Sequence, residues 1–202
     1  MTRDRSNDIE VLDMPWPIAV LAVGSPLLLA AVIWICSQIY QPALVVDPIM
    51  YPALQVNQVV VVDTRPYGPR RTPKYGDVLA YNPPTAPGLT FFGRVAALEG
   101  DRIRVSHSVV IVNDKPLLRA RAAVTFTEWG NEKMMVFTET APNGTAYHVL
   151  TSGSVDGDME ELRVPAGAVF VLGDTRDGAL DSRSALGGFG PIGYEIIRGR
   201  VM

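Results

Sequence analysis

The sequence predicts a mainly β domain behind one N-terminal apolar helix, and three observations support this. The chain has 202 residues and carries no charged residue between Asp13 and Asp47. The rest of the chain is built from short apolar or alternating runs, the pattern of half-buried strands. The 16 prolines and 18 glycines interrupt these runs. A chain of this length suits one domain of ordinary size behind the apolar segment.

The apolar segment Trp16–Tyr40 predicts a transmembrane anchor over residues 15–40. As an α-helix this segment would be about 37 Å long, which exceeds the ~30 Å hydrocarbon core of a bilayer. A cleaved signal peptide is the alternative. The run is longer than the core of a signal peptide, however, and no clear small-residue cleavage site follows it. The sequence therefore favours a retained anchor.

The basic residues predict how the anchor is oriented. Arg3 and Arg5 precede it, and the next basic residue is Arg65. By the positive-inside rule, residues 1–14 form a cytoplasmic tail and residues 41–202 form an extracytoplasmic domain. The expected location is the inner membrane of a bacterium, which the chain crosses once.

Five segments after the anchor read as strands, because apolar and β-branched residues fill them between turn residues. They are residues 58–64, 76–82, 90–98, 101–113 and 166–174. A turn is expected at Asn113–Pro116, next to a hairpin. Residues 119–163 are more polar, and for them we expect loops or an inserted hairpin. An irregular set of β-sheets fits this pattern better than a helical domain.

Composition argues against several function classes. The net charge is −3 and the basic residues are scattered, so nothing favours nucleic-acid binding. His107 and His148 lie far apart without cysteine neighbours, so we expect no metal and no cofactor. The single cysteine, Cys36, lies in the anchor, so we expect no disulfide. The oligomeric state cannot be predicted from these features.

Four segments, taken in order, resemble the motif boxes of bacterial signal peptidase I. They are "DPIMYPALQVNQVVVVDTRPYG" (47–68), "PKYGDVLAYNPP" (73–84), "FFGRVAALEGDRIRV" (91–105) and "VPAGAVFVLGDTRDGALDSRSALGGFGPI" (164–192). The fourth segment is the most specific, with its Gly-Asp-x-Arg-Asp and Asp-Ser-Arg sequences. The resemblance implies a membrane-anchored serine protease fold, in which a lysine activates a serine.

The resemblance also implies which positions should carry the chemistry, and here all four have lost it. The nucleophile falls on Ile49 and the general base on Gly93. The hydroxyl of the oxyanion hole falls on Asp47, and the serine that orients the lysine falls on Ala179. Each replacement removes the required atom, and a carboxylate at position 47 would repel a developing oxyanion. No intact catalytic residue is therefore predicted.

The resemblance places a substrate between residues 45–48 and 91–93, bound as an added β-strand. The residues expected to line its pocket are Val45, Met50, Leu54, Phe91 and Phe92. The alternative is that these side chains are simply core. The acids Asp174, Asp177 and Asp181, together with Arg176 and Arg183, are expected to form a structural ion-pair network.

Three hypotheses for the function follow. The first is a signal-peptidase-like membrane protein that binds signal peptides, or exported or pilin-like segments, without cleaving them. Its partners would be the lipid bilayer and the exported segment. The second is an active signal peptidase with a relocated dyad. Its base would be His148 or one of the three lysines, and its nucleophile one of six serines: Ser106, Ser108, Ser152, Ser154, Ser182 and Ser184, with Lys74, Lys115 and Lys133 as the lysines. The third is a structural subunit of an envelope or secretion complex.

Overall fold

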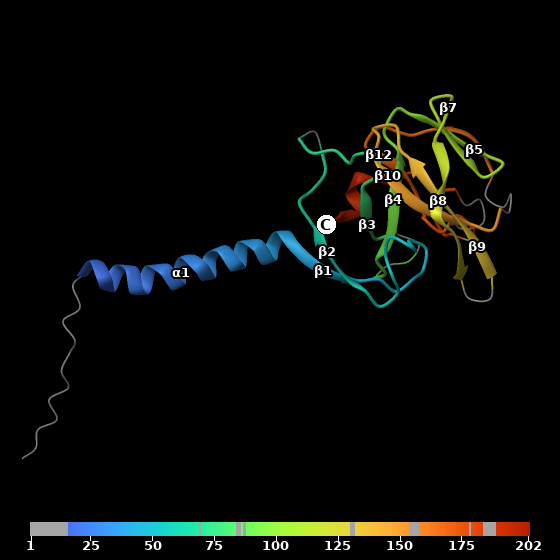
Figure 1. Cartoon of the computed structure of the whole chain (residues 1–202). Coiled ribbons are helices and arrows are strands. Elements are labelled where there is room, and N and C mark those ends of the chain that lie inside the picture. The colour runs from blue at the N-terminus through green and yellow to red at the C-terminus, as the bar shows by residue number, and fades with distance from the viewer. Residues whose placement is uncertain are drawn as a thin grey trace, which may run out of the picture. The chain divides into compact units, whose positions relative to one another are not determined.

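The structure is a computed structural model, and it describes residues 16–68, 70–83, 86, 88–129, 132–153, 158–177, 179–183 and 189–202. The chain divides into two units, Met1–Gln38 and Ile39–Met202. The first holds nearly all of the helix α1, and the second holds the β-sheets that Figure 1 shows.

The helix α1 runs from Trp16 to Ile39, where the sequence predicts a helix. Its side chains Leu28, Ile33 and Trp34 are 70%, 60% and 66% exposed. Among the helices in the described residues, none combines the length and the apolar character needed to cross a bilayer.

The largest sheet has seven antiparallel strands. Their order across the sheet is β1 (Tyr40–Leu44), β2 (Val59–Asp63), β14 (Ile197–Val201), β3 (Val78–Tyr81), β4 (Phe91–Ala97), β12 (Ala168–Leu172) and β13 (Ile192–Gly193). A 3₁₀ turn, η1 (Tyr194–Ile196), links β13 to β14. All five residues of β12 are buried, which explains why its sequence is apolar without alternation.

Two smaller sheets complete the domain. One has the order β10 (Ala146–Thr151), β9 (Glu132–Thr140) and β8 (Leu118–Trp129). The other has the order β11 (Met159–Arg163), β5 (Arg102–Ser106), β6 (Val109–Val112) and β7 (Lys115–Pro116). The domain is therefore mainly β, as the sequence predicts.

All five predicted strand segments contain strands. Of the turn expected at Asn113–Pro116, only Asn113 and Asp114 form the turn between β6 and β7, because Lys115 and Pro116 pair with β6 as β7. The main difference lies in residues 119–163. They hold most of β8 together with β9, β10 and β11, which is far more strand than one inserted hairpin. Their polar residues alternate with apolar ones such as Met134 and Val136, which are buried.

Candidate functional site

The predicted nucleophile position lies in the turn between β1 and β2. Backbone bonds close this turn at its base, since Val45 N donates to Gln58 O at 2.9 Å and Asn57 N donates to Val45 O at 2.8 Å. Within it, Leu54 N donates to Met50 O at 2.8 Å. We name residues 45–54 the 45–54 turn.

The fourth motif box, residues 164–192, also holds the 45–54 turn in place through Thr175. Thr175 N donates to Ile49 O at 2.8 Å. The Thr175 hydroxyl lies 3.2 Å from Pro48 O and 3.1 Å from Tyr51 O. Two segments more than a hundred residues apart are thus held together around Ile49, as an active site of this type would require.

Two of the four predicted chemical positions meet at Gly173. A Cβ atom built on Gly173 would collide with Ile49 Cγ2 and would lie 2.9 Å from Ala179 Cβ. The side chains of Ile49 and Ala179 therefore face the same point on the backbone. Where the family resemblance expects the nucleophilic serine and the serine that orients the lysine, this chain has two aliphatic side chains.

Asp47 occupies the place expected for an oxyanion donor, and its carboxylate binds the Ile49 backbone. Asp47 Oδ1 accepts a hydrogen bond from Ile49 N at 3.0 Å. Burial raises the pKa of the half-buried Asp47 carboxyl, and the bond from Ile49 N partly opposes that rise. The N–H of a nucleophile residue is a common oxyanion donor. Here that N–H is already bonded to a group of the wrong charge.

Gly93, at the predicted base position, has no room for a side chain. A Cβ there would lie 3.0 Å from both Val171 Cβ and Val171 Cγ2, and 3.3 Å from Tyr81 Cε1. Val171 is fixed in β12, where its N–H donates to the Ser182 hydroxyl at 3.1 Å. Restoring a lysine at position 93 would require both neighbours to move.

Gly93→Ala should lower the free energy of unfolding by about 1–3 kcal/mol, because the added methyl group overpacks the contact with Val171. Urea unfolding of the purified protein measures this. Gly68→Ala is the matched control, since a Cβ at Gly68 meets nothing within 4 Å. Equal stabilities for the two variants would show that the space beside Gly93 is not filled.

Four of the five predicted pocket residues are buried in the core. Val45 and Met50 are 0% exposed, Phe92 is 1% exposed and Leu54 is 6% exposed, and all four belong to one hydrophobic cluster. Phe91 is partly exposed, and its ring lies 5.2 Å from that of Phe189. This placement fits the alternative that they are core, and a pocket-lining role for them stays a prediction.

All three lysines of the chain are exposed: Lys74, Lys115 and Lys133. A lysine that acts as a general base is typically buried, because desolvation favours its neutral form, and none of these three is buried. Two histidines contact hydroxyls: Ser106 Oγ lies 3.1 Å from His107 Nδ1, and Thr138 Oγ1 lies 3.2 Å from His148 Nδ1. Both histidines are exposed. Within the described residues, no group of three or more metal-ligating side chains occurs.

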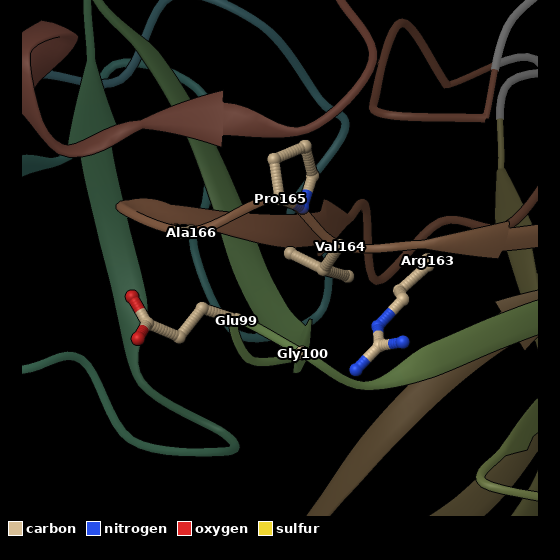
Figure 2. Close-up of a pocket in the computed structure, with 6 residues that line it drawn as sticks. All are labelled: Glu99, Gly100, Arg163, Val164, Pro165 and Ala166. Atoms are coloured by element: carbon tan, nitrogen blue, oxygen red, sulfur yellow. The ribbon is translucent and has the colours of Figure 1, made fainter.

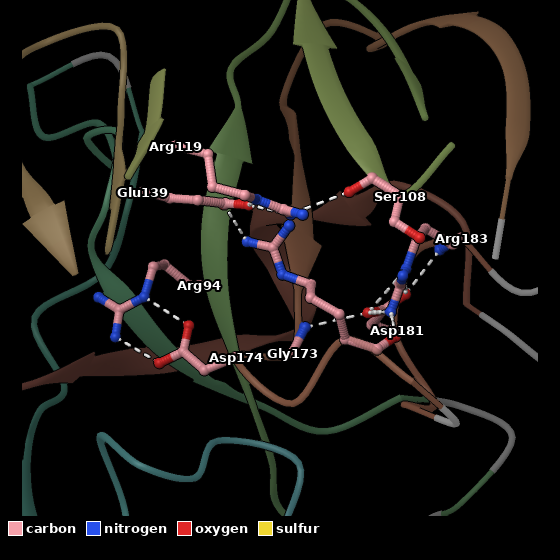
Figure 3. A network of polar contacts seen from close by, with 9 residues as sticks. Arg94, Ser108, Arg119, Glu139, Gly173, Asp174, Asp181 and Arg183 are labelled. Carbon is pink, nitrogen blue, oxygen red and sulfur yellow. Dashed lines mark hydrogen bonds and ion pairs between the residues drawn. The ribbon is translucent and has the colours of Figure 1, made fainter. Parts of the chain in front are cut away.

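A buried ion pair joins β4 to the fourth box (Figure 3). Arg94 Nε and Nη2 lie 2.7 Å and 2.6 Å from the two oxygens of Asp174, which is 0% exposed. Arg94 Nη1 also donates to Gly76 O at 2.8 Å, and its guanidinium lies 4.4 Å from the centre of the Tyr147 ring. This pair sits one residue from Gly93.

A second group of ion pairs connects the fourth box to the sheet of β8, β9 and β10, as Figure 3 also shows. Glu139 on β9 accepts from Arg119 Nε at 3.0 Å and from Arg176 Nη2 at 2.5 Å. Arg183 pairs with Asp181 and donates to Arg176 O at 2.6 Å. Burial acts to raise the pKa of Glu139, but Arg176 and Arg119 more than offset it and hold that pKa below its usual value.

The structural network predicted for the box is therefore present, but most of its partners differ from the prediction. Asp181 does pair with Arg183. Asp174 pairs with Arg94, and Arg176 pairs with Glu139, both outside the box. Asp177 accepts from the Thr151 hydroxyl at 3.1 Å and from Ser152 N. The sequence did not predict these partners, because folding brings together residues that lie far apart along the chain.

Of the surface hollows in the described part of the chain, two lie near the 45–54 turn and the end of β4, respectively. One, of about 280 Å³, is lined by Tyr51, Pro52, Ala122, Ala123, Val136, His148 and Leu150. The other, of about 380 Å³, is shown in Figure 2 and lies beside the turn after β4, between Glu99 and Arg163. Glu99 accepts from Gly167 N at 2.8 Å. Neither hollow is lined by the residues predicted to carry chemistry.

Tyr81, like Thr175, is a residue of the site that the sequence analysis did not single out. It is 0% exposed, and its ring contacts the space beside Gly93. A tyrosine at the end of an apolar strand reads as core, so only the position of Gly93 could have drawn attention to it.

Comparison with known proteins places this geometry in a family. The family described as "Signal peptidase, peptidase S26" matches residues 18–202. The chain is 34% identical to signal peptidase I of Rickettsia bellii over 125 residues, which cover 58% of this chain and 43% of that protein. It is 33% identical to signal peptidase I of Rickettsia akari over 125 residues, which cover 58% of this chain and 47% of that protein.

A crystal structure of a signal peptidase I from Enterococcus faecalis matches with a TM-score of 0.39 at 20% identity, covering 65% of this chain and 98% of that chain. The chain spans less than half of the length of the curated relatives named above. Since the family match runs from residue 18 to residue 202, the chain belongs to the signal peptidase family, peptidase S26.

Proposed function

We propose that this chain is a pseudopeptidase, which binds a signal peptide or an exported or pilin-like segment without cleaving it. One observation carries the proposal: Ile49 stands at the nucleophile position, and the contacts that hold the site together around it are present. Its backbone is bonded to Thr175 and Asp47, and its side chain faces Gly173 and Ala179. The frame of the site is thus kept while its reactive atoms are gone.

Magnitudes support loss of catalysis. In a comparable serine protease, removal of the nucleophile or the base costs about 10⁶ in kcat, and the effects of such residues do not add. Loss of one oxyanion donor costs about 10²–10³. Any one of the replacements at positions 47, 49 and 93 would therefore reduce turnover severely. Together they leave neither the nucleophilic hydroxyl nor the lysine amine of the family at these positions.

A strand edge without a second strand partner supports peptide binding. Residues 91–93 of β4 pair with β3 on one side, through Tyr81, Ala80 and Leu79. On the other side, β12 pairs only with Arg94, Val95 and Ala97. In the described sheet, the first three residues of β4 thus lack a second strand neighbour. An extended peptide could add there as a strand, its backbone providing affinity.

The test is a photocrosslink from the 45–54 turn. A photoreactive phenylalanine analogue at the exposed Pro48 should crosslink to a preprotein that has small residues near its cleavage point. The same analogue at the exposed Lys115 of β7 is the control. If position 48 gives no more crosslink than position 115, the chain does not hold the peptide beside the 45–54 turn, and the structural-subunit hypothesis is favoured.

One observation favours the rival enzyme hypothesis, namely the contact between Ser106 Oγ and His107 Nδ1. The two residues are neighbours in the sequence, at the turn between β5 and β6. The nearby Asp158 carboxylate is bonded to His107 N and Ser108 N. That hypothesis requires Ser106→Ala to abolish cleavage of a preprotein. If the wild-type chain cleaves nothing, the rival hypothesis has no activity to explain.

We propose a bacterial inner membrane as the place of action, with attachment through α1. Support comes from the uncharged sequence between Asp13 and Asp47 and from the exposed apolar side chains of the helix. After cell fractionation, the chain should stay with membranes through an alkaline carbonate wash. A chain lacking residues 1–39 should not, and equal release of both would exclude α1 as the attachment.

A further inference from the structure

The hollow beside the 45–54 turn, of about 280 Å³, has a mostly apolar lining. Three of its lining residues, Ala122, Val136 and Leu150, are buried and belong to one hydrophobic cluster. Two others, Ala123 and His148, are exposed, so the hollow opens to solvent. Apolar walls offer water few hydrogen bonds, and an apolar group that enters such a hollow leaves water favourably.

An irregularity in the strand pairing accounts for the hollow. β8 and β9 pair regularly on either side of residues 122–125, and these residues lie opposite the single residue Val136 of β9. Ala122 and Ala123 of this bulge line the hollow together with Val136, and the small alanine side chains leave its space unfilled. Bulges are over-represented next to active sites, where they redirect side chains.

The hollow adjoins the site around Ile49. Tyr51 lies two residues after Ile49 and lines the hollow. Thr175 binds both residues, since its N–H donates to Ile49 O and its hydroxyl lies 3.1 Å from Tyr51 O. Leu150, another lining residue, donates its N–H to Asp174 O at 2.8 Å, next to Thr175. Two residues of backbone span at most about 7–8 Å, so an extended peptide beside Ile49 can reach the hollow within about two or three residues.

The size and chemistry of the lining favour an aromatic ring as the occupant. An apolar cavity of about 150 Å³ takes up benzene. The hollow, at about 280 Å³, therefore has room for a phenyl or indole group. Its lining includes the rings of Tyr51, Pro52 and His148. Aromatic rings gain free energy from stacked or edge-on contacts with one another, beyond the area that they bury.

We propose that this hollow binds one aromatic side chain of the peptide held beside Ile49. The inference rests on the proposed peptide-binding function and adds a specificity to it. The chain selects exported segments that carry phenylalanine or tryptophan about two or three positions from the residue that lies beside Ile49. An apolar lining, an opening to solvent and closeness to the site are combined in the same few residues.

The experiment compares the binding of matched fluorescent peptides to the purified full chain. The peptides consist of small apolar residues with a C-terminal label, and one position at a time holds alanine, leucine or phenylalanine. At one of these positions, phenylalanine should strengthen binding about tenfold over alanine, because a large apolar side chain becomes buried. Leucine at that position should bind about threefold more weakly than phenylalanine, because it lacks the contacts between rings.

Three variants locate the effect. Ala123→Trp places a large side chain in the hollow from an exposed position, so the fold should persist while the preference for phenylalanine is lost. Ala166→Trp is the control, because it is the same change at an exposed alanine of the hollow in Figure 2, and it should keep the preference. His148→Ala removes one exposed ring and should weaken phenylalanine binding about threefold. Urea midpoints verify that the variants are folded.

The outcomes separate this inference from the proposed function. If alanine and phenylalanine peptides bind equally at every position, or if a folded Ala123→Trp variant keeps the preference, the hollow does not bind the side chain and peptide binding still stands. If leucine binds as tightly as phenylalanine, the selection of an aromatic ring is wrong. If no peptide of the series binds, the proposed function fails and this inference fails with it.

Discussion

Replacing Glu139 with alanine should lower the free energy of unfolding by about 3–5 kcal/mol, because it leaves a buried arginine without its carboxylate partner. Glu139 is 1% exposed and Arg176 is 3% exposed. Without the carboxylate, the guanidinium of Arg176 loses its recorded ion-pair partner and stays out of water. Arg119 is less affected, since it also donates to Ser108 O at 2.9 Å. The midpoint of urea unfolding measures the change.

The matched control is Glu161→Ala. Glu161 pairs with Arg102 at 3.4 Å, but the two side chains are 41% and 46% exposed. Exposed pairs contribute about 0–1 kcal/mol. If Glu139→Ala and Glu161→Ala destabilise the chain equally, the buried network has no structural role.

The same carboxylate gives a pH dependence with a defined sign. The pKa of Glu139 in the folded chain lies below its usual value, so its contribution is complete above the unfolded value of about 4.3. The contribution is lost as the pH falls below that value and through the folded pKa. Glu139→Gln should therefore make stability less sensitive to acid in this range.

Replacing Arg94 with methionine should also cost about 3–5 kcal/mol of unfolding free energy. The change leaves Asp174, which is 0% exposed, without its two bonds from Arg94. The bond to Gly76 O and the contact with the Tyr147 ring disappear as well. Arg102→Met, on an exposed side chain, is the control.

The double variant Arg94→Met with Asp174→Leu tests whether the two side chains stabilise the fold through their contact with each other. Removing both buried charges should restore most of the stability that either single change loses, since apolar replacements of buried pairs are often neutral. Additive losses in the double variant would mean that the two side chains act independently. That result would contradict the direct pairing seen between β4 and the fourth box.

The sequence predicted the strands best where burial is complete. Ala168–Leu172 is apolar without interruption because the whole strand is buried, and in the largely buried Phe91–Ala97 only Gly93 and Arg94 interrupt the apolar residues. It predicted least where strands are half exposed. In β9, the exposed Lys133 and the half-buried Thr138 stand among the buried Met134 and Val136. The buried Glu139 of the same strand finds its partners, Arg119 and Arg176, on other segments of the chain. Pattern alone reads such stretches as loops.

The sequence predicted which catalytic residues are missing from the site, but not which side chains occupy the space beside them. The alignment of motifs pointed to Ile49, Gly93, Asp47 and Ala179, and the structure brings Ile49 and Ala179 to one glycine. It could not show that Val171 and Tyr81 fill the space beside Gly93, because these contacts join three separate strands. Nor could it show that most of the predicted pocket residues are core.

Retention of the fourth box is explained without catalysis. Asp174 and Arg176 bind buried partners on β4 and β9, and Thr175 holds the 45–54 turn. Loss of any of these contacts would loosen the domain whether or not it cleaves peptides. A chain that has lost its reactive side chains would therefore still keep this box.

The most direct test of the account is a preprotein cleavage assay with the purified full chain. A family member that retains its serine and lysine serves as the positive control under the same conditions. We expect no cleaved product from this chain over a period in which the control processes all of its substrate. Cleavage at the signal-peptide junction that depends on this chain would contradict the proposal, because Ile49 and Gly93 offer no nucleophile and no base.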